Sequence, residues 1–412
     1  MNSKDLIIKA IEHESIARIP IDLGSTMISG LHISLIKKLR KYYGLQEKSI
    51  KLIEPQQMLG EIDDDLKKVI GIDTRGMTPY KNIFGMKNLM WQEWQLPDGQ
   101  IIQVPEEFYT EKDNQNNIYI FPKGNNSVPP SAIMQATESS LNLIKRQEQI
   151  DEKEIKLKNN LHELKLISDN ELNYLVHEAS SISEAQRATI FTSKFTFLGN
   201  INYILAPYLE DPKGIRNLQD WYIAHIENPD YIKRIFAYQT KIALKNLAKI
   251  NFRIGEYIDI ILVCATDFGG QNSLFISPEI FRNLYKPFYK KINRWVHDNT
   301  GWKTMKHSCG AINDILEDII DSGFDILNPL QFSALQTTPA NLKKKWGDQI
   351  TLWGNCIDTE LLVSGDPEEI RKKAKDNSKI LSQNGGYVFS PESLPQNTPI
   401  QNILALLQAI KK

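Results

Sequence analysis

The chain has 412 residues, of which 41% are hydrophobic and 24% are charged. This composition supplies enough apolar side chains for a large core and excludes disorder over the whole length. Lysine and arginine number 49 against 50 acidic residues, and no long basic stripe occurs, so a nucleic-acid or anionic-membrane surface is not supported. We expect the partner to be a small molecule or another protein.

The three cysteines, Cys264, Cys309 and Cys356, are too few for a disulfide framework. Their odd number is typical of reduced thiols in a reducing compartment. The first residues mix charged and apolar side chains without a cleavage signature, and no window reaches about 18 uninterrupted apolar residues. We therefore expect a cytoplasmic protein.

The first part of the chain predicts helices around an early strand. Ser3 can cap a short helix whose apolar residues recur at helical spacing, and residues 18–24 predict the first strand. Residues of about 31–44 and 61–70 have helical patterns, and 70–75 is extended. The chain thus enters its core early.

The pattern then changes to short strands. A Leu-Pro-Asp-Gly turn signal precedes the run 100–104, and residues 118–121 predict another strand. From about 138 to 184, polar residues surround spaced leucines and isoleucines, which predicts surface helices. We predict a single domain over 1–412 with an insertion or cap at about 91–184.

The second half alternates extended runs with helical patterns, as a parallel sheet requires. The predicted strands are 188–197, 258–266, 303–307, 325–327, 350–354 and 387–390. Three helix starts carry a cap residue followed by proline, at Ser277-Pro278, Asp366-Pro367 and Thr398-Pro399. Glycine-rich phosphate loops are missing from the sequence, which favours a closed barrel over a nucleotide-binding open sheet. The predicted fold is α/β, a (β/α)8 TIM barrel with an N-terminal extension and a β-rich and helical insertion.

A His-x-Cys pair stands at the end of one predicted strand, where barrel enzymes build their active sites. His307 and Cys309 are two residues apart, so in extended geometry both side chains point to the same face and could reach one metal ion. Cys356, just past another predicted strand, is a candidate third ligand. One imidazole and two thiolates are typical of a catalytic zinc site that leaves its fourth position for substrate. The alternative is that the pair arose by chance and the cysteines are buried small hydrophobes.

Several segments resemble one known family. They are His307-Ser-Cys309-Gly-Ala-Ile312, Asp325-Ile-Leu-Asn-Pro-Leu-Gln331, Gly354-Asn-Cys356-Ile-Asp-Thr359, Gly365-Asp-Pro-Glu-Glu369, Gly385-Gly386 and Pro399-Ile-Gln-Asn-Ile403. Together they resemble the uroporphyrinogen decarboxylase superfamily, and within it the zinc-dependent, corrinoid-linked methyltransferase branch. The resemblance is dense from about residue 255 onward and thin at Arg18-Ile-Pro-Ile-Asp22 and Ile70-Gly-Ile-Asp73-Thr-Arg75.

The resemblance implies a zinc methyltransferase on a (β/α)8 barrel, with His307, Cys309 and Cys356 as the metal ligands. It implies that a methyl group moves from a small methoxylated compound, which we expect to be aromatic, to the cobalt of a separate corrinoid protein. The Asp-x-His-x-x-Gly motif by which resembling corrinoid carriers hold cobalt does not occur in this sequence, so the corrinoid is expected on the partner. The alternative within the branch is a methylcobalamin:thiol methyltransferase of the coenzyme M type.

Other polar residues near the predicted strand ends are candidates for substrate chemistry. Asp267 is expected to be catalytic, because it follows a strand and could orient the substrate, give a proton to a leaving oxygen or approach the zinc. Gln271, Asn328, Gln331 and Asp22 are candidates for lining the substrate pocket. A turn, a helix cap or loop hydrogen bonding is the structural alternative for each.

Two further functions remain open at this point. The loop from Asp22 to Gly30 contains no arginine or lysine, whereas the resembling decarboxylases carry an arginine-rich loop there to hold porphyrinogen carboxylates. Decarboxylation of uroporphyrinogen is therefore disfavoured. A barrel that only binds corrinoid proteins as a scaffold is the non-catalytic alternative.

Overall fold

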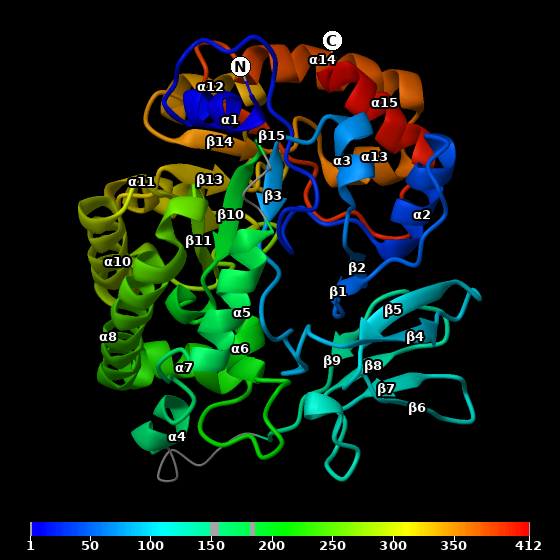
Figure 1. Ribbon diagram of the computed structural model, residues 1–412. Coiled ribbons are helices and arrows are strands. Elements are labelled where there is room, and N and C mark those ends of the chain that lie inside the picture. Colours follow the sequence, from blue (N-terminus) through cyan, green and yellow to red (C-terminus); the bar gives the residue numbers. More distant parts are fainter. Residues whose placement is uncertain (1, 149–155, 182–185, 412) are drawn as a thin grey trace.

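The computed structural model describes residues 2–148, 156–181 and 186–411. Its central sheet has seven parallel strands in the order β15-β14-β13-β12-β11-β10-β3. The strands are β3 (Thr74–Gly76), β10 (Ala188–Thr192), β11 (Ile260–Ala265), β12 (Lys303–His307), β13 (Ile326–Asn328), β14 (Thr351–Gly354) and β15 (Tyr387–Phe389). Figure 1 shows this sheet curling behind its covering helices.

Residues 20–22 occupy the eighth strand position and close the barrel. Ile21 forms a parallel bridge with Phe389 of β15. The backbone N–H of Asp22 donates to the Phe389 carbonyl at 2.8 Å, and on the other side the N–H of Asp73 donates to the Ile21 carbonyl at 2.8 Å. The predicted (β/α)8 architecture is confirmed, because the last strand connects through this segment to the first.

Alternate strand residues fill the barrel interior, and the N-terminal extension closes one end of it. Ile190, Leu262, Met305 and Trp353 belong to a buried cluster inside the barrel. Helix α1 (Ser3–Ile11) contributes Ile7, Ala10 and Ile11 to the same cluster. The carbonyl of Ala10 accepts from Gly386, just before β15, so α1 lies at the N-terminal ends of the strands. The opposite, C-terminal end is left for chemistry.

Of the four helix caps predicted from the sequence, two are present in the structure and two are not. Ser277 and Asp366 cap α9 (Pro278–Ile280) and α14 (Pro367–Leu381) as predicted. Asn2, rather than Ser3, caps α1, because Ser3 is already helical and its hydroxyl donates to Asp73. Helix α15 (Ile400–Ile410) starts after Pro399 without a side-chain cap, so the predicted Thr398 cap is wrong.

The remaining helices follow the chain around the sheet. They are α2 (Ile33–Tyr42), α3 (Asp64–Ile70), α4 (Leu157–Leu161), α5 (Asp169–Ser180), α6 (Ile201–Leu205), α7 (Leu218–Glu227), α8 (Pro229–Ile254), α10 (Lys286–Asn299), α11 (Asn313–Asp321), α12 (Pro339–Trp346) and α13 (Thr359–Ser364), with short turns η1 (Pro122–Gly124), η3 (Lys194–Thr196), η4 (Gly255–Tyr257) and η5 (Phe281–Tyr285). Among the described residues, none of the helices combines the length and apolar character needed to cross a membrane.

Two small antiparallel sheets lie in the chain between β3 and β10. One is the hairpin β4 (Trp91–Gln95) and β5 (Ile101–Pro105), and the other contains β6 (Thr110–Lys112), β7 (Ile118–Ile120), β8 (Ala132–Met134) and β9 (Asn142–Leu143). Figure 1 shows both below the pair β1 (Leu52–Glu54) and β2 (Leu59–Gly60), which the sequence patterns did not predict. Of the predicted helical stretch 138–184, residues 149–155 and 182–184 lie outside the described residues. That residues 91–184 act as a cap stays a prediction.

Candidate metal centre

Two neighbouring strands bring Asp267, His307 and Cys309 to the C-terminal mouth of the barrel. Strand β11 pairs with β12 so that Ala265 lies opposite His307. Met305 points into the barrel, so His307, two residues later, faces the same interior. Asp267 follows β11 by two residues, and Cys309 follows β12 by two residues. Strand register therefore determines the meeting of these three residues.

The donor atoms of the three residues are spaced as ligands of one ion. One ligand atom from each lies within 4.8 Å of the other two. The Cys309 Sγ atom is 3.5 Å from His307 Nε2, and Asp267 Oδ1 is 3.6 Å from the same nitrogen. Tetrahedral zinc, with bonds of about 2.3 Å to sulfur and about 2.0 Å to nitrogen, would separate the sulfur from the nitrogen by about 3.5 Å. The separation of Cys309 Sγ and His307 Nε2 therefore matches that of two ligands of one zinc ion, with Asp267 Oδ1 close by.

Close backbone packing holds the two loops together. Gly310 has a φ of +89°, and a Cβ there would lie 2.2 Å from the carbonyl oxygen of Gly269. Only glycine fits such a position. The backbone N–H of Cys309 donates to Asp267 Oδ1 at 2.8 Å. These contacts fix the carboxylate beside the sulfur.

Asn328 determines which nitrogen of His307 is free. The Asn328 side-chain amide donates through Nδ2 to the Trp353 carbonyl at 2.9 Å, so its Oδ1 must face His307. That oxygen lies 2.5 Å from His307 Nδ1. Nδ1 therefore carries the proton, and Nε2 keeps its lone pair for the position between Cys309 and Asp267. Asn328, predicted to line a substrate pocket, orients the histidine and is fully buried.

Burial disfavours the charged form of two of the three donors. It lowers the pKa of His307, although the nearby Asp267 carboxylate opposes this effect. Burial, followed by the Asp267 charge, raises the pKa of the Cys309 thiol far above its ordinary value. A divalent cation would reverse the second effect, because it stabilises the thiolate directly. The chemistry of the donor set thus fits a metal as well as its geometry does.

A buried polar chain continues behind Cys309. Gln331 accepts through Oε1 from the Gly310 N–H at 2.8 Å and donates through Nε2 to Glu392 at 3.0 Å. Burial raises the pKa of Glu392 to about 7. Gln331 therefore supports the loop that carries Cys309, and Glu392 is an acidic residue near the mouth that the sequence analysis did not single out.

Cys356 lies apart from this group in the structure. It follows β14 by two residues, is fully buried, and belongs to the hydrophobic layer between the sheet and its helices. Burial raises the pKa of its thiol to about 12, against the opposing effect of the nearby Tyr387 hydroxyl. Its sulfur is not among the ligand atoms that gather around His307. Cys356 as the third ligand stays a prediction.

The other predicted residues differ in exposure. Gln271 is exposed on the loop after β11. Asp22 is 1% exposed and accepts hydrogen bonds from Thr74 at 2.7 Å and from the Trp353 indole at 3.0 Å. Both hydrogen bonds hold the Asp22 carboxylate inside the barrel. Its role toward substrate stays a prediction.

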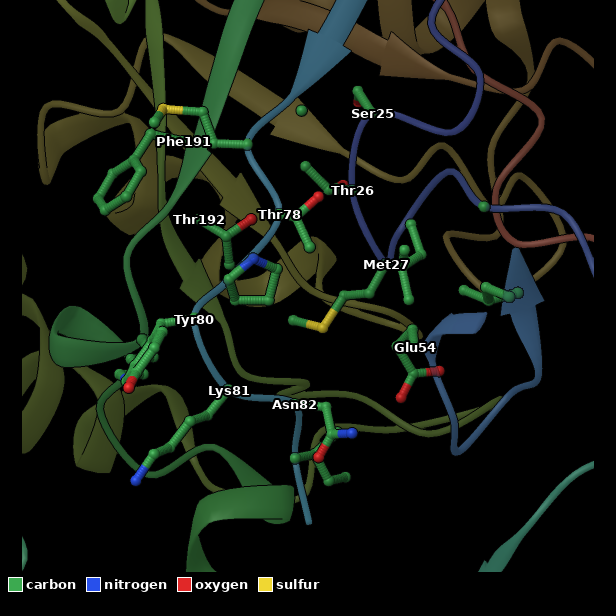
Figure 2. A pocket seen from close by; sticks show the side chains of 18 of the residues that line it. Ser25, Thr26, Met27, Glu54, Thr78, Tyr80, Lys81, Asn82, Phe191 and Thr192 are labelled. Carbon is green, nitrogen blue, oxygen red and sulfur yellow. The ribbon is translucent and has the colours of Figure 1, made fainter. Parts of the chain in front are cut away.

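Two adjoining cavities open at the same end of the barrel, with volumes of about 150 and 370 Å³. The smaller is lined by the loops after residues 20–22, β3 and β10, and Figure 2 shows Met27, Glu54, Lys81 and Asn82 around it. Neither lining includes His307 or Cys309. The sequence analysis missed Glu54 and Lys81. The one available signal was the rule that barrel sites form at the C-terminal ends of strands, which indicates the loops after β3 and β10 but no particular residue in them.

Comparison with known proteins identifies the family. The family model described as uroporphyrinogen decarboxylase (URO-D) matches residues 174–412. The chain belongs to the uroporphyrinogen decarboxylase family. Two curated relatives from Methanosarcina barkeri, one of them from strain Fusaro / DSM 804, are both named methylcobamide:CoM methyltransferase MtaA. Each is 30% identical over 135 residues, which are 32% of this chain and 37% of the relative.

A solved structure supports the barrel over the whole length of this URO-D family member. A methyltransferase from Methanosarcina mazei aligns with a TM-score of 0.56 and 14% identity, covering 99% of this chain and 98% of that one. At this identity the likeness concerns the fold. The curated relatives match little more than a third of their own length, so activity is argued from the site.

Proposed function

We propose that this protein is a zinc-dependent methyltransferase that moves a methyl group from a small methoxylated aromatic compound to the cobalt of a separate corrinoid protein. The observation that carries the proposal is the cluster of Asp267, His307 and Cys309 at the barrel mouth. The names of the curated relatives support methyl transfer with a corrinoid.

His307 and Cys309 would hold the zinc, with Asp267 beside it and Cys356 as a further ligand. What supports Cys356 is its place directly after β14, at the same edge of the sheet, and its segment's resemblance to the family. When bound, zinc supplies Lewis acidity that weakens the bond between a methyl group and its oxygen.

The protein's own residues would perform the remaining tasks. Asn328 keeps the His307 ring in one tautomer. The Asp267 side chain is 36% exposed, so it reaches the mouth and can exchange a proton with the leaving alcohol or phenol. Closely packed glycine loops fix its distance from Cys309. A corrinoid protein would dock over the barrel mouth, where these residues lie.

The second candidate function is methyl transfer from methylcobalamin to a thiol. The names of the curated relatives favour it, because both are methylcobamide:CoM methyltransferases. The aromatic side chains that line the cavities, among them Tyr80, Phe195 and Tyr203, favour the methoxylated aromatic donor instead.

The deciding experiment compares the two directions with the purified, zinc-loaded protein. A methoxyaromatic with reduced cobalamin should yield methylcobalamin and the free phenol, and the variant Cys309→Ala should abolish this yield. Methyl transfer only from methylcobalamin to 2-mercaptoethanesulfonate would replace the first proposal by the second. Carbon dioxide release from uroporphyrinogen without added metal would overturn both. Corrinoid-protein binding that survives Cys309→Ala, with no turnover in either direction, would support a scaffold.

A further inference from the structure

The larger cavity has an excess of positive charge. Five cationic side chains line it, Lys81, Lys123, Lys165, Lys194 and Arg216, against two acidic ones, Glu163 and Glu171. A cavity of about 370 Å³ is large enough for a small organic molecule. Lined in this way, it favours an anion.

Ion pairs neutralise most of these charges, but not Lys81. Lys194 pairs with Glu171 at 2.8 Å, and Lys123 pairs with Glu210 at 3.2 Å. Arg216 pairs with Glu163. Within the described ranges, neither Lys81 nor Lys165 forms an ion pair, although the charges of Glu171 and Glu107 act on Lys81 at longer range. Lys165 is exposed and therefore screened by solvent. Lys81 is thus the partly buried cation of this cavity that has no ion-pair partner among the described residues.

Lys81 lies where the two cavities join. Its side chain lines both of them, and Figure 2 shows it beside Tyr80 and Asn82 on the segment that follows β3. Burial and the neighbouring Lys194 lower the pKa of Lys81. An anion placed at this junction would remove the cost of the half-buried charge.

Aromatic rings surround the same junction. Tyr80, Phe195, Tyr203 and Tyr208 line both cavities. The Tyr203 and Tyr208 rings lie 6.3 Å apart between centroids. Such side chains offer planar, apolar surface on which a flat ring can stack. The Lys81 ammonium lies 6.0 Å from the centre of the Tyr80 ring, so it can bind a polar substituent of a ring that stacks nearby.

We infer that Lys81 determines specificity by binding a carboxylate on the ring of the methyl donor, which makes the preferred donor an aromatic acid. The inference rests on the proposed function only in taking the ligand to be a methyl donor. The binding of an aromatic acid by Lys81 does not depend on that function. One ammonium neutralises one negative charge, so a monoanion fits better than a phosphate dianion. The aromatic walls favour a ring over a short aliphatic sulfonate.

The test measures binding to the full-length protein by titration calorimetry. The probes are 4-methoxybenzoate, uncharged methoxybenzene and 2-mercaptoethanesulfonate. We expect 4-methoxybenzoate to bind about tenfold or more tightly than methoxybenzene, as a charge-assisted hydrogen bond allows. Lys81→Met should remove this difference while leaving methoxybenzene binding unchanged, and Lys81→Arg should keep most of it.

The matched control is Lys87→Met. Lys87 is exposed, pairs with Glu107 at 3.0 Å, and lines neither cavity. The Lys87→Met variant should bind all three probes as the wild type does. The inference would be overturned if the wild type bound 4-methoxybenzoate and methoxybenzene equally well, or bound 2-mercaptoethanesulfonate more tightly than 4-methoxybenzoate. It would also be overturned if Lys81→Met and Lys87→Met lost the same affinity for 4-methoxybenzoate.

Failure of the proposed function would look different. If 4-methoxybenzoate binds through Lys81 but no methyl group moves to cobalamin, only the proposed function fails. If methyl transfer occurs but Lys81→Met has the same preference between acidic and uncharged donors as the wild type, only the role of Lys81 fails.

Discussion

Asn328 offers the sharpest test of how the metal centre is organised. The variant Asn328→Leu keeps a similar shape but removes the amide that joins His307 Nδ1 to the Trp353 carbonyl. Asn328 is 0% exposed, so water cannot replace either hydrogen bond without a rearrangement. Both the stability of the fold and the affinity for zinc should fall.

The two losses have separate magnitudes. Each buried polar group left without a partner costs about 1 to 3 kcal/mol, so the free energy of unfolding should fall by about 2 to 6 kcal/mol. Loss of a hydrogen bond that orients a metal-binding histidine typically weakens metal binding by about 10-fold to 100-fold. Without this hydrogen bond the His307 ring can rotate or change tautomer, so the lone pair of Nε2 would face the metal for only part of the time.

Asn328→Asp separates the two effects. Its carboxylate can accept the Nδ1 proton of His307 but cannot donate to Trp353, so zinc affinity should be kept while stability still falls. Zinc affinity is measured by competition with a chromophoric chelator at pH 7, and stability by urea unfolding of the metal-free protein. The reasoning is refuted if Asn328→Leu binds zinc as tightly as the wild type.

Two further predictions concern other buried residues. Cys356→Ala should lower zinc affinity by at least about 100-fold if the Cys356 sulfur is a zinc ligand. The control is Cys264→Ala, in the core between β11 and α10, which should bind zinc as the wild type does. Unchanged zinc affinity in both variants would leave Asp267, His307 and Cys309 as the ligands. Burial lowers the pKa of His225 to about 4, so on acidification the unfolded chain takes up this proton first. His225 alone should lower the free energy of unfolding of the metal-free protein by about 3 kcal/mol between pH 6.5 and 4. Urea unfolding across this range checks the slope, which His225→Gln should flatten; an equal slope in both proteins would contradict the assignment.

The barrel could be predicted from the sequence because its strands and helices are local patterns in a regular order. The meeting of His307 and Cys309 with Asp267 was also accessible, since all three follow neighbouring strands at one edge of a parallel sheet. The strand pair β1 and β2 was not, because strands this short form only against tertiary partners.

Long-range contacts determine what the sequence could not show. Lys306 reads as a surface lysine, yet it is fully buried, with its ammonium 3.1 Å from Cys264 Sγ and bonded to the carbonyls of Thr266 and His307. Asn328 reads as a pocket residue until Trp353, 25 positions away, fixes its amide. Lys81 becomes notable only because the fold places it in the cavity wall without an ion pair among the described residues, while its neighbour Lys194 pairs with Glu171.

The most direct measurement is the zinc content of the purified protein by elemental analysis. The account predicts about one zinc per chain after dialysis against metal-free buffer, and loss of that zinc in His307→Ala and in Cys309→Ala, both of which should retain the circular dichroism of the wild type. A wild-type protein that holds no zinc after saturation, or zinc that stays bound in both variants, would contradict a metal centre at the barrel mouth.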